Sequence, residues 1–263
     1  MPARNAIPIL LYHSVADGPG GDRWSVSRAA FAAHLDLLVE EGWRSTTVSE
    51  LADGLGAGRE LPPKTVCVTF DDGFADFHSD ALPLMEERGI ASTLYVTTSA
   101  VGDGHRRPQD NPWGAAMVSW EQLAEISTRN VEIGGHSHHH VELDTLRPSS
   151  VSEEVTTCKA QLEDRLGIPV RSFAYPHGYS SASVRAAVRK AGYLSACSVK
   201  NALSSPSDDL FTLPRLMLSR DTTLEQLRRW TSGTGVATSP PDDRPIAVAW
   251  RLARRLRAAV GSR

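Results

Sequence analysis

Two adjacent carboxylates follow a short apolar run near residue 70. The run Val66-Cys67-Val68 is typical of a buried strand, and Asp71 and Asp72 come where that strand opens into a loop. Because neighbouring side chains of an extended chain point opposite ways, one aspartate could bind a metal ion while the other faces substrate or water. The Asp-Asp-Gly sequence could equally be no more than the start of a helix.

A histidine-rich segment, His136-Ser137-His138-His139-His140, follows a second strand-like run at residues 131–135. His136 and His140 have the spacing that lets two imidazoles of one helical turn reach a single ion. With one aspartate they make a two-histidine, one-carboxylate set, which suits Zn²⁺, Co²⁺ or Fe²⁺. The alternative is a solvated loop that binds metal adventitiously, and the internal position of the segment makes a purification tag an unsuitable explanation.

Strand-like and helix-like segments alternate along the whole chain. Strands are predicted at residues 8–12, 66–70, 92–96, 131–135, 171–175, 194–199 and 213–218. Helices are predicted at residues 27–41, 47–55, 76–88, 121–127, 149–166, 183–191 and 222–230. This alternation predicts a parallel barrel or sheet with helices outside, in which chemistry gathers at the carboxyl ends of the strands. The aspartate pair, the histidine segment, His13 and Pro176-His177 each follow a predicted strand, so we expect them to share one site.

The order of these motifs resembles that of the polysaccharide deacetylase family, the NodB-homology carbohydrate esterases. The family's first motif is TFDDG, here at residues 69–73, and its second is His-(Ser/Thr)-x-x-His, here at residues 136–140. Its third motif has an altered counterpart, FAYPHG, at residues 173–178. The branch that contains the poly-N-acetylglucosamine deacetylases also begins with a Tyr-His pair, here Tyr12-His13. The resemblance covers roughly residues 7 to 230.

The resemblance implies an α/β fold, a distorted, incomplete (β/α) barrel with about seven parallel strands. It implies a metal-dependent hydrolase that removes N-acetyl groups from an N-acetylated amino sugar and releases acetate. The carbohydrate partner would be a polysaccharide, an oligosaccharide or a lipid-linked precursor. The cofactor would be one divalent metal ion, foremost Zn²⁺, with Co²⁺, Ni²⁺ or Fe²⁺ as alternatives. Two rival functions stay open, a metal-dependent amidase for a small non-sugar amide and a sugar-binding relative without catalysis.

Residue roles follow from the same resemblance. The implied metal ligands are Asp72, His136 and His140. Asp71 is the implied general base, and the backbone N–H of His177 the implied oxyanion donor. We expect His13 to protonate the departing amine, with the His177 side chain as the alternative acid. Tyr175 and Pro176, together with Trp113 from a long loop at residues 99–118, are candidates for substrate binding.

The chain departs from the family pattern at two places. Ala174 stands where the wider family has arginine, and His177 where it has tyrosine; a late Leu-x-x-His element is also missing at residues 216–219. Arg215 could replace the missing guanidinium beside Asp71, or it could form a salt bridge at the rim.

Length and composition set the remaining expectations. The 263 residues suit one barrel domain over residues 1–230, followed at 231–263 by a linker and a basic amphipathic helix. That helix, at residues 246–260, could contact an anionic membrane surface or pack on the domain. The net charge of −3 gives no basic field for nucleic acid. Three cysteines in apolar contexts are predicted to be reduced, and the short apolar run at the N-terminus predicts a cytoplasmic location.

Overall fold

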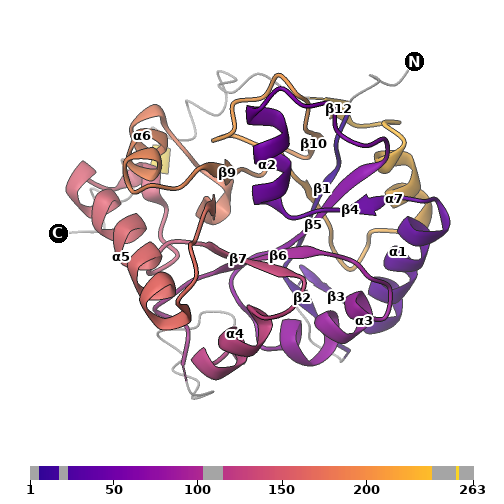
Figure 1. Cartoon of the computed structure of the whole chain (residues 1–263), viewed down its shortest axis with the longest axis horizontal. Helices are drawn as coiled ribbons and strands as arrows, with labels where there is room; N and C mark the ends of the chain where they lie inside the picture. The colour runs from indigo at the N-terminus through magenta and orange to yellow at the C-terminus, as the bar shows by residue number, and fades with distance from the viewer. Residues whose placement is uncertain (1–5, 18–22, 103–114, 239–252, 255–263) are drawn as a thin grey trace.

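A parallel β-sheet forms the centre of the computed structural model, in which residues 6–17, 23–102, 115–238 and 253–254 are described (Figure 1). In chain order its strands are β1 (Ile9–Tyr12), β4 (Arg44–Ser45), β5 (Thr65–Phe70), β6 (Ser92–Val96), β7 (Val131–Gly135), β8 (Ser172–Ala174), β9 (Ser195–Cys197) and β11 (Leu216–Met217). Trp113 and most of the predicted helix at 246–260 lie outside the described residues.

Seven strands follow one another in the order β11-β1-β5-β6-β7-β8-β9, and β4 pairs with β5 outside this path. All of these pairings are parallel. Between β9 and β11 the structure, where described, has a single isolated bridge that joins Cys197 to Leu213. The predicted distorted, incomplete barrel of seven parallel strands is confirmed.

Helices connect the strands and surround the sheet (Figure 1). They are α1 (Arg28–Glu40), α2 (Val48–Gly56), α3 (Leu82–Glu86), α4 (Trp120–Ile126), α5 (Pro148–Leu166), α6 (Ala182–Lys190) and α7 (Leu224–Thr231). The helix predicted at 76–88 is instead a π-helical turn, η1 (Phe77–Ala81), followed by α3. Pro83 explains this difference because it has no N–H to donate, and the Leu82 N–H bonds back to the Phe77 carbonyl five residues earlier.

Two short strand pairs lie outside the sheet. One joins β2 (Ser14–Val15) to β3 (Ser25–Val26), and the other joins β10 (Ala202–Leu203) to β12 (Ala237–Thr238). The second pair brings the chain back to the domain after α7. No helix in the described part of the chain combines the length and the apolar character needed to cross a bilayer.

The two faces of the sheet carry different side chains. On β5, Val66, Val68 and Phe70 belong to the main core beneath the helices, whereas Cys67 belongs to a smaller cluster on the other face. That smaller cluster also contains Ile9, Tyr95, Ala174, Cys197 and Leu213, so it fills the inside of the curved sheet. All three cysteines are free and buried, which confirms the prediction for them.

A partly buried carboxylate organises the amino-terminal end of the barrel interior. Glu132 of β7 accepts hydrogen bonds from the Ser49 N–H at 3.0 Å and the Ser49 hydroxyl at 2.5 Å. The hydroxyls of Thr93 and Ser172 donate to it at 3.0 and 2.6 Å. The first turn of α2 is thereby joined to three strands, and its N-terminal N–H group gains an acceptor.

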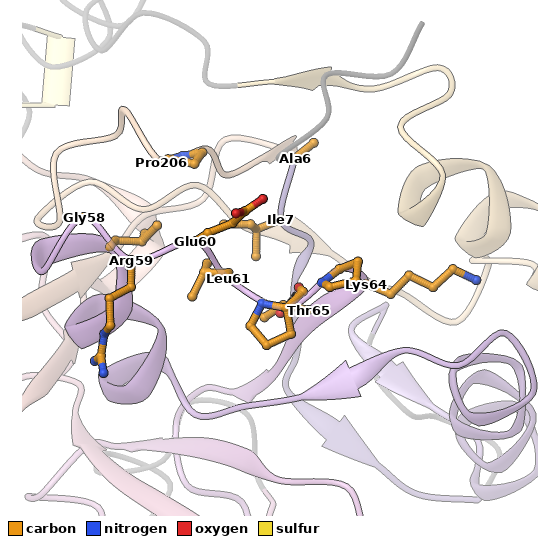
Figure 2. A pocket seen from close by; sticks show the side chains of 12 residues that line it. Ala6, Ile7, Gly58, Arg59, Glu60, Leu61, Lys64, Thr65 and Pro206 are labelled. Atoms are coloured by element: carbon orange, nitrogen blue, oxygen red, sulfur yellow. Dashed lines mark hydrogen bonds between the residues drawn. The ribbon is translucent and has the colours of Figure 1, made fainter.

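A pocket of about 390 Å³ opens at this same end of the molecule (Figure 2). Thr65 at the start of β5 and Ile7 just before β1 line it, together with the loop at residues 58–64. The aspartate pair follows the other end of β5. The pocket therefore lies at the opposite end of the sheet from the predicted site.

Gly134→Ala is expected to lower the free energy of unfolding by about 1–3 kcal/mol through overpacking. A Cβ at Gly134 would lie 2.5 Å from the Tyr95 ring and 2.9 Å from the Ser172 hydroxyl. Gly56→Ala in α2 is the matched control, because its Cβ would meet Leu210 at an ordinary 3.5 Å and alanine favours a helix. Chemical denaturation measures both, and an unchanged Gly134→Ala midpoint would contradict the tight interior.

Candidate active site

The predicted site residues lie in loops at the carboxyl ends of adjacent strands. Asp71 and Asp72 follow β5, and His136 follows β7. His13 follows β1, whose end is fixed beside β5 because the Asp71 N–H donates to the Tyr12 carbonyl at 3.1 Å. The loops after β1, β5 and β7 therefore meet at the carboxyl end of the sheet, as the sequence predicted.

Asp71 lies in a buried ion pair with Arg215. The two terminal nitrogens of the guanidinium donate to the two carboxylate oxygens, each at 2.7 Å, and Nε donates to the Ser198 carbonyl at 3.2 Å. Arg215 is 0% exposed. Burial alone would raise the pKa of Asp71, but the guanidinium outweighs it and lowers that pKa below its ordinary value. Of the two interpretations of Arg215, the partner of Asp71 is observed and the rim salt bridge is wrong.

The side chain of Arg215 approaches Asp71 from the amino-terminal end of the parallel strands. It directly precedes β11, whose Leu216 is in register with Leu10 of β1, and Leu10 is in register with Val68. The backbone of Arg215 therefore lies well before the end of β5. Its side chain extends along the barrel interior, 3.3 Å from the Thr69 hydroxyl, to the carboxylate at the top.

Asp72, His136 and His140 converge beside this pair, with one ligand atom of each within 4.8 Å of the others. The Nε2 atoms of His140 and His136 lie 3.2 and 3.4 Å from Asp72 Oδ1. Burial would raise the pKa of Asp72, but the two imidazoles hold it well below its ordinary value. The carboxylate is therefore ionised at neutral pH.

The surroundings of the three side chains fit a divalent cation. Asp72 Oδ1 is buried and forms no hydrogen bond of good geometry with any described residue. His136 Nδ1 lies 2.8 Å from the carbonyl oxygen of Ala174, so Nδ1 donates, and Nε2, the atom that faces Asp72, is the one that could bind a metal when the ring is neutral. An ionised carboxylate and an imidazole held in a fixed orientation are what a metal ion requires, so this set could bind one.

A left-handed backbone brings Asp72 to the site. Alternation along β5 directs Cys67 and then Asp71 inward, and would direct Asp72 outward. Asp72 instead has φ of 75°, which changes the course of the chain. The two adjacent aspartates thus both reach the site and still have different partners.

The segment from His136 to His140 is not helical, so the predicted helical turn is wrong although the two imidazoles do meet. Ser137 and His140 have φ of 62° and 56°. The His140 N–H donates to the Ser137 hydroxyl at 2.9 Å. A tight loop with two left-handed residues places the rings, whose centroids are 4.9 Å apart.

Glu154 of α5 holds this loop from behind. One of its oxygens accepts the N–H groups of His138 and His139 at 3.0 and 2.8 Å, and the other lies 2.7 Å from His139 Nδ1. This residue was not predicted from the sequence. The sequence did contain a signal for it, because Glu154 is an acidic residue on the same helix face as the apolar residues Val151, Val155 and Cys158.

Trp24 was also missed, and it lies against His13 with ring centroids 5.8 Å apart. Partial burial lowers the pKa of His13, while Asp72 and Asp71 act to raise it. These interactions place His13 within electrostatic reach of the aspartate pair. The loop around Trp24 carried no motif from which its position could be predicted.

The third motif contributes only part of what was expected. The Tyr175 side chain is buried and donates its hydroxyl to the Phe211 carbonyl at 3.0 Å, so its predicted role in binding substrate is wrong. The reason is alternation, since Ala174 faces the barrel interior and Tyr175 therefore faces the helices. Pro176 is also buried. The His177 ring, in contrast, lies 4.7 Å from that of His140.

The sequence profile of the polysaccharide deacetylase family matches residues 58–196, more than half of the chain. The chain belongs to this family. The first two motifs and the strands that carry them lie within the matched residues. The predicted family is therefore confirmed.

Curated relatives agree with this assignment. Bacillus subtilis YxkH, which is named after the polysaccharide deacetylases, is 25% identical over 81% of this chain and 71% of its own length. The poly-β-1,6-N-acetyl-D-glucosamine N-deacetylase of Escherichia coli K12 is 22% identical over 84% of this chain. The chain matches only 38% of that enzyme's length.

Solved structures show the same fold. IcaB from Ammonifex degensii superposes with a TM-score of 0.73 at 27% identity, covering 87% of this chain and 97% of its own. The Streptococcus pyogenes deacetylase PplD superposes with a TM-score of 0.77 at 21% identity, covering 88% and 99%. Family membership makes the chain a deacetylase-family protein, and the Asp72–His136–His140 set is where a metal ion could bind.

Arg215→Met is expected to destabilise the fold by about 3–5 kcal/mol, because Asp71 would stay buried without its cation. Adding Asp71→Asn should restore part of that loss. Arg228→Met is the control, since Arg228 is an exposed arginine paired with Glu41, and an exposed pair of this kind contributes little to stability. Urea denaturation measures all of them. A double variant as unstable as Arg215→Met would show that the uncompensated charge is not the cause.

Proposed function

We propose that this protein is a metal-dependent hydrolase that removes N-acetyl groups from an N-acetylated amino sugar and releases acetate. One observation supports the proposal most strongly: two adjacent aspartates have different partners, and each arrangement suits a different task in amide hydrolysis. Asp72 joins two imidazoles in a set suited to a metal ion, and Asp71 next to it is held ionised by Arg215. The names of the relatives supply the substrate class.

Zn²⁺ is the ion we assign to Asp72, His136 and His140, with Co²⁺, Ni²⁺ and Fe²⁺ as alternatives. Two imidazoles and one carboxylate leave positions for water and substrate, as in other hydrolytic zinc sites. When bound there, such an ion would polarise the amide carbonyl and acidify a water molecule. Every other part of the reaction falls to the chain's own residues.

Asp71 is proposed as the general base. Its lowered pKa keeps it ionised, and the two bonds from Arg215 fix the plane of the carboxylate. It accepts a proton from the attacking water as the carbon–oxygen bond forms. His13, on the adjacent β1 loop, then donates a proton to the departing nitrogen, so that a neutral amine leaves.

The backbone N–H of His177 is proposed as the oxyanion donor. In the loop from Tyr175 to Tyr179 the other N–H groups have acceptors: those of Tyr175, Gly178 and Tyr179 bond to the carbonyls of Cys197, Tyr175 and Pro176. Pro176 has no N–H. A φ of 58° at His177 turns the peptide beside the metal-ligand candidates, where charge on the carbonyl oxygen would develop.

Acetate release from N-acetylglucosamine oligomers tests the function directly. The same assay with a small non-sugar acetamide distinguishes the rival amidase. Oligomer binding without acetate release, in protein loaded with Zn²⁺, would support a sugar-binding relative and contradict the proposal.

A cytoplasmic location and a soluble or lipid-linked substrate stay predictions of the sequence.

Asparagine substitutions at the two aspartates are expected to affect metal content and turnover differently. Asp72→Asn should lose both metal and turnover, whereas Asp71→Asn should keep the metal and lose about 10² to 10⁴ in rate, as expected for a general base. Elemental analysis and acetate release measure the two properties, with His136→Ala and His140→Ala as matched losses of a ligand. Equal loss of metal in both aspartate variants would contradict this division of roles.

The pH profile tests His13. As the acid it must be protonated while Asp71 is ionised, so kcat/KM should be bell-shaped and should fall as the pH rises through the pKa of His13. Because partial burial lowers that pKa, the alkaline limb is expected below the ordinary histidine value of about 6.5.

His13→Ala should keep its metal and fold, lose about 10²-fold or more in rate, and lose the alkaline limb. Trp24→Phe is the control, because it keeps an aromatic ring against His13. An alkaline limb that persists in His13→Ala would move the role of acid to His177 or another group.

A further inference from the structure

A residue from the far end of the chain lies at one rim of the site. The guanidinium of Arg254 donates from Nη2 to Asp144 Oδ2 at 2.5 Å, and its Nε lies 3.4 Å from Glu142 Oε2. Its central carbon lies 3.5 Å from the centroid of the Tyr179 ring. A single cation therefore contacts two acidic residues and one aromatic face.

These contacts are shielded from water. The side chain of Asp144 is 1% exposed and that of Arg254 is 10% exposed, in contrast to the exposed ion pairs elsewhere on the surface. A buried carboxylate is costly unless a cation and hydrogen bonds compensate it. Planar stacking on Tyr179 adds an interaction that lysine would reproduce poorly.

The partners of Arg254 belong to two loops that carry site residues. Glu142 and Asp144 come two and four residues after His140. Tyr179 comes two residues after His177, and the rings of these two lie 6.0 Å apart. His177 in turn contacts His140 at 4.7 Å. Arg254 thus bridges the loop after β7 and the loop after β8 on the side of the site where His140 lies.

His140 is the metal-ligand candidate with the greatest need of such support. Its side chain is 12% exposed, against 1% for His136 and 4% for Asp72. The carbonyl of Ala174 orients His136. The loop that carries His140 is held at one end by Glu154 and, two to four residues further on, by Arg254.

We propose that Arg254 is a positioning residue, which holds these two loops together and so fixes His140 for metal binding. The inference rests on the proposed metal site but does not require that the substrate be an amino sugar. For Arg254 the contacts favour packing on the domain, which was the alternative to contact with an anionic membrane. Arg254 engaged by Asp144 and Glu142 is not free to meet lipid phosphate.

The test is the affinity of the full-length protein for Zn²⁺, measured by competition with a chromophoric chelator. Arg254→Ala is expected to bind Zn²⁺ about 10-fold more weakly, the lower end of what loss of an outer-shell partner costs. Arg254→Lys should recover only part of the affinity. Arg228→Ala, an exposed arginine paired with Glu41 on the α1 and α7 side, is the matched control and should bind as the parent does.

A double-mutant cycle with Asp144→Asn separates positioning from general stability. If the bridge acts as proposed, Asp144→Asn also weakens Zn²⁺ binding, and the double variant is less impaired than the sum of the two single variants. A fall in Tm with unchanged Zn²⁺ affinity would overturn the proposal and leave a structural contact only. Weaker binding to anionic vesicles, with unchanged Zn²⁺ affinity, would overturn it in favour of a membrane contact. Because Zn²⁺ affinity needs no substrate, failure of the deacetylase assay would not affect this result.

Discussion

The buried ion pair between Arg215 and Asp71 is the interaction on which the rest of the site depends. A charged pair in a barrel interior is tolerated only when its hydrogen bonds are satisfied, and here the guanidinium also donates to Ser198 and Thr69. Those partners come from β5 and from the segment after β9, so the pair joins the two sides of the incomplete barrel. Asp71 directly precedes Asp72, and His136 Nε2 lies 3.8 Å from Asp71 Oδ2, so the metal-ligand candidates lie next to this fixed pair.

Backbone strain is concentrated in the loops above this pair. Asp72, Ser137, His140 and His177 all have φ between 56° and 75°, a region that residues other than glycine rarely adopt. Such conformations persist only when their surroundings determine them. Here hydrogen bonds hold the strained residues in place: the Thr97 N–H donates to the Asp72 carbonyl, and two N–H groups of the histidine loop donate to Glu154. The geometry of the site is thus built from the loops rather than from a helix.

The fold and the identity of the central residues could be predicted from the sequence, because both depend on local patterns. Seven apolar runs alternate with amphipathic segments, and the aspartates and histidines follow directly after such runs. What could not be predicted depends on partners distant in the chain. Arg215 lies 144 residues from Asp71, and nothing local distinguishes its buried pairing from a rim salt bridge. The outward direction of Tyr175 follows from strand alternation, but only once the exact register of β8 is known.

The difference between the two adjacent aspartates is a difference in partners, not in burial, since both are 3% exposed. Asp71 faces a guanidinium, which stays charged at every relevant pH, so its negative charge is already compensated before any ligand arrives. Asp72 faces two imidazoles, which can be neutral and can turn their lone pairs toward an ion. A divalent cation would therefore gain most from Asp72 and least from Asp71. Asp71, ionised but electrostatically balanced, keeps its remaining lone pairs for a proton. The site would then carry a net positive charge, which favours an oxyanion at the same place.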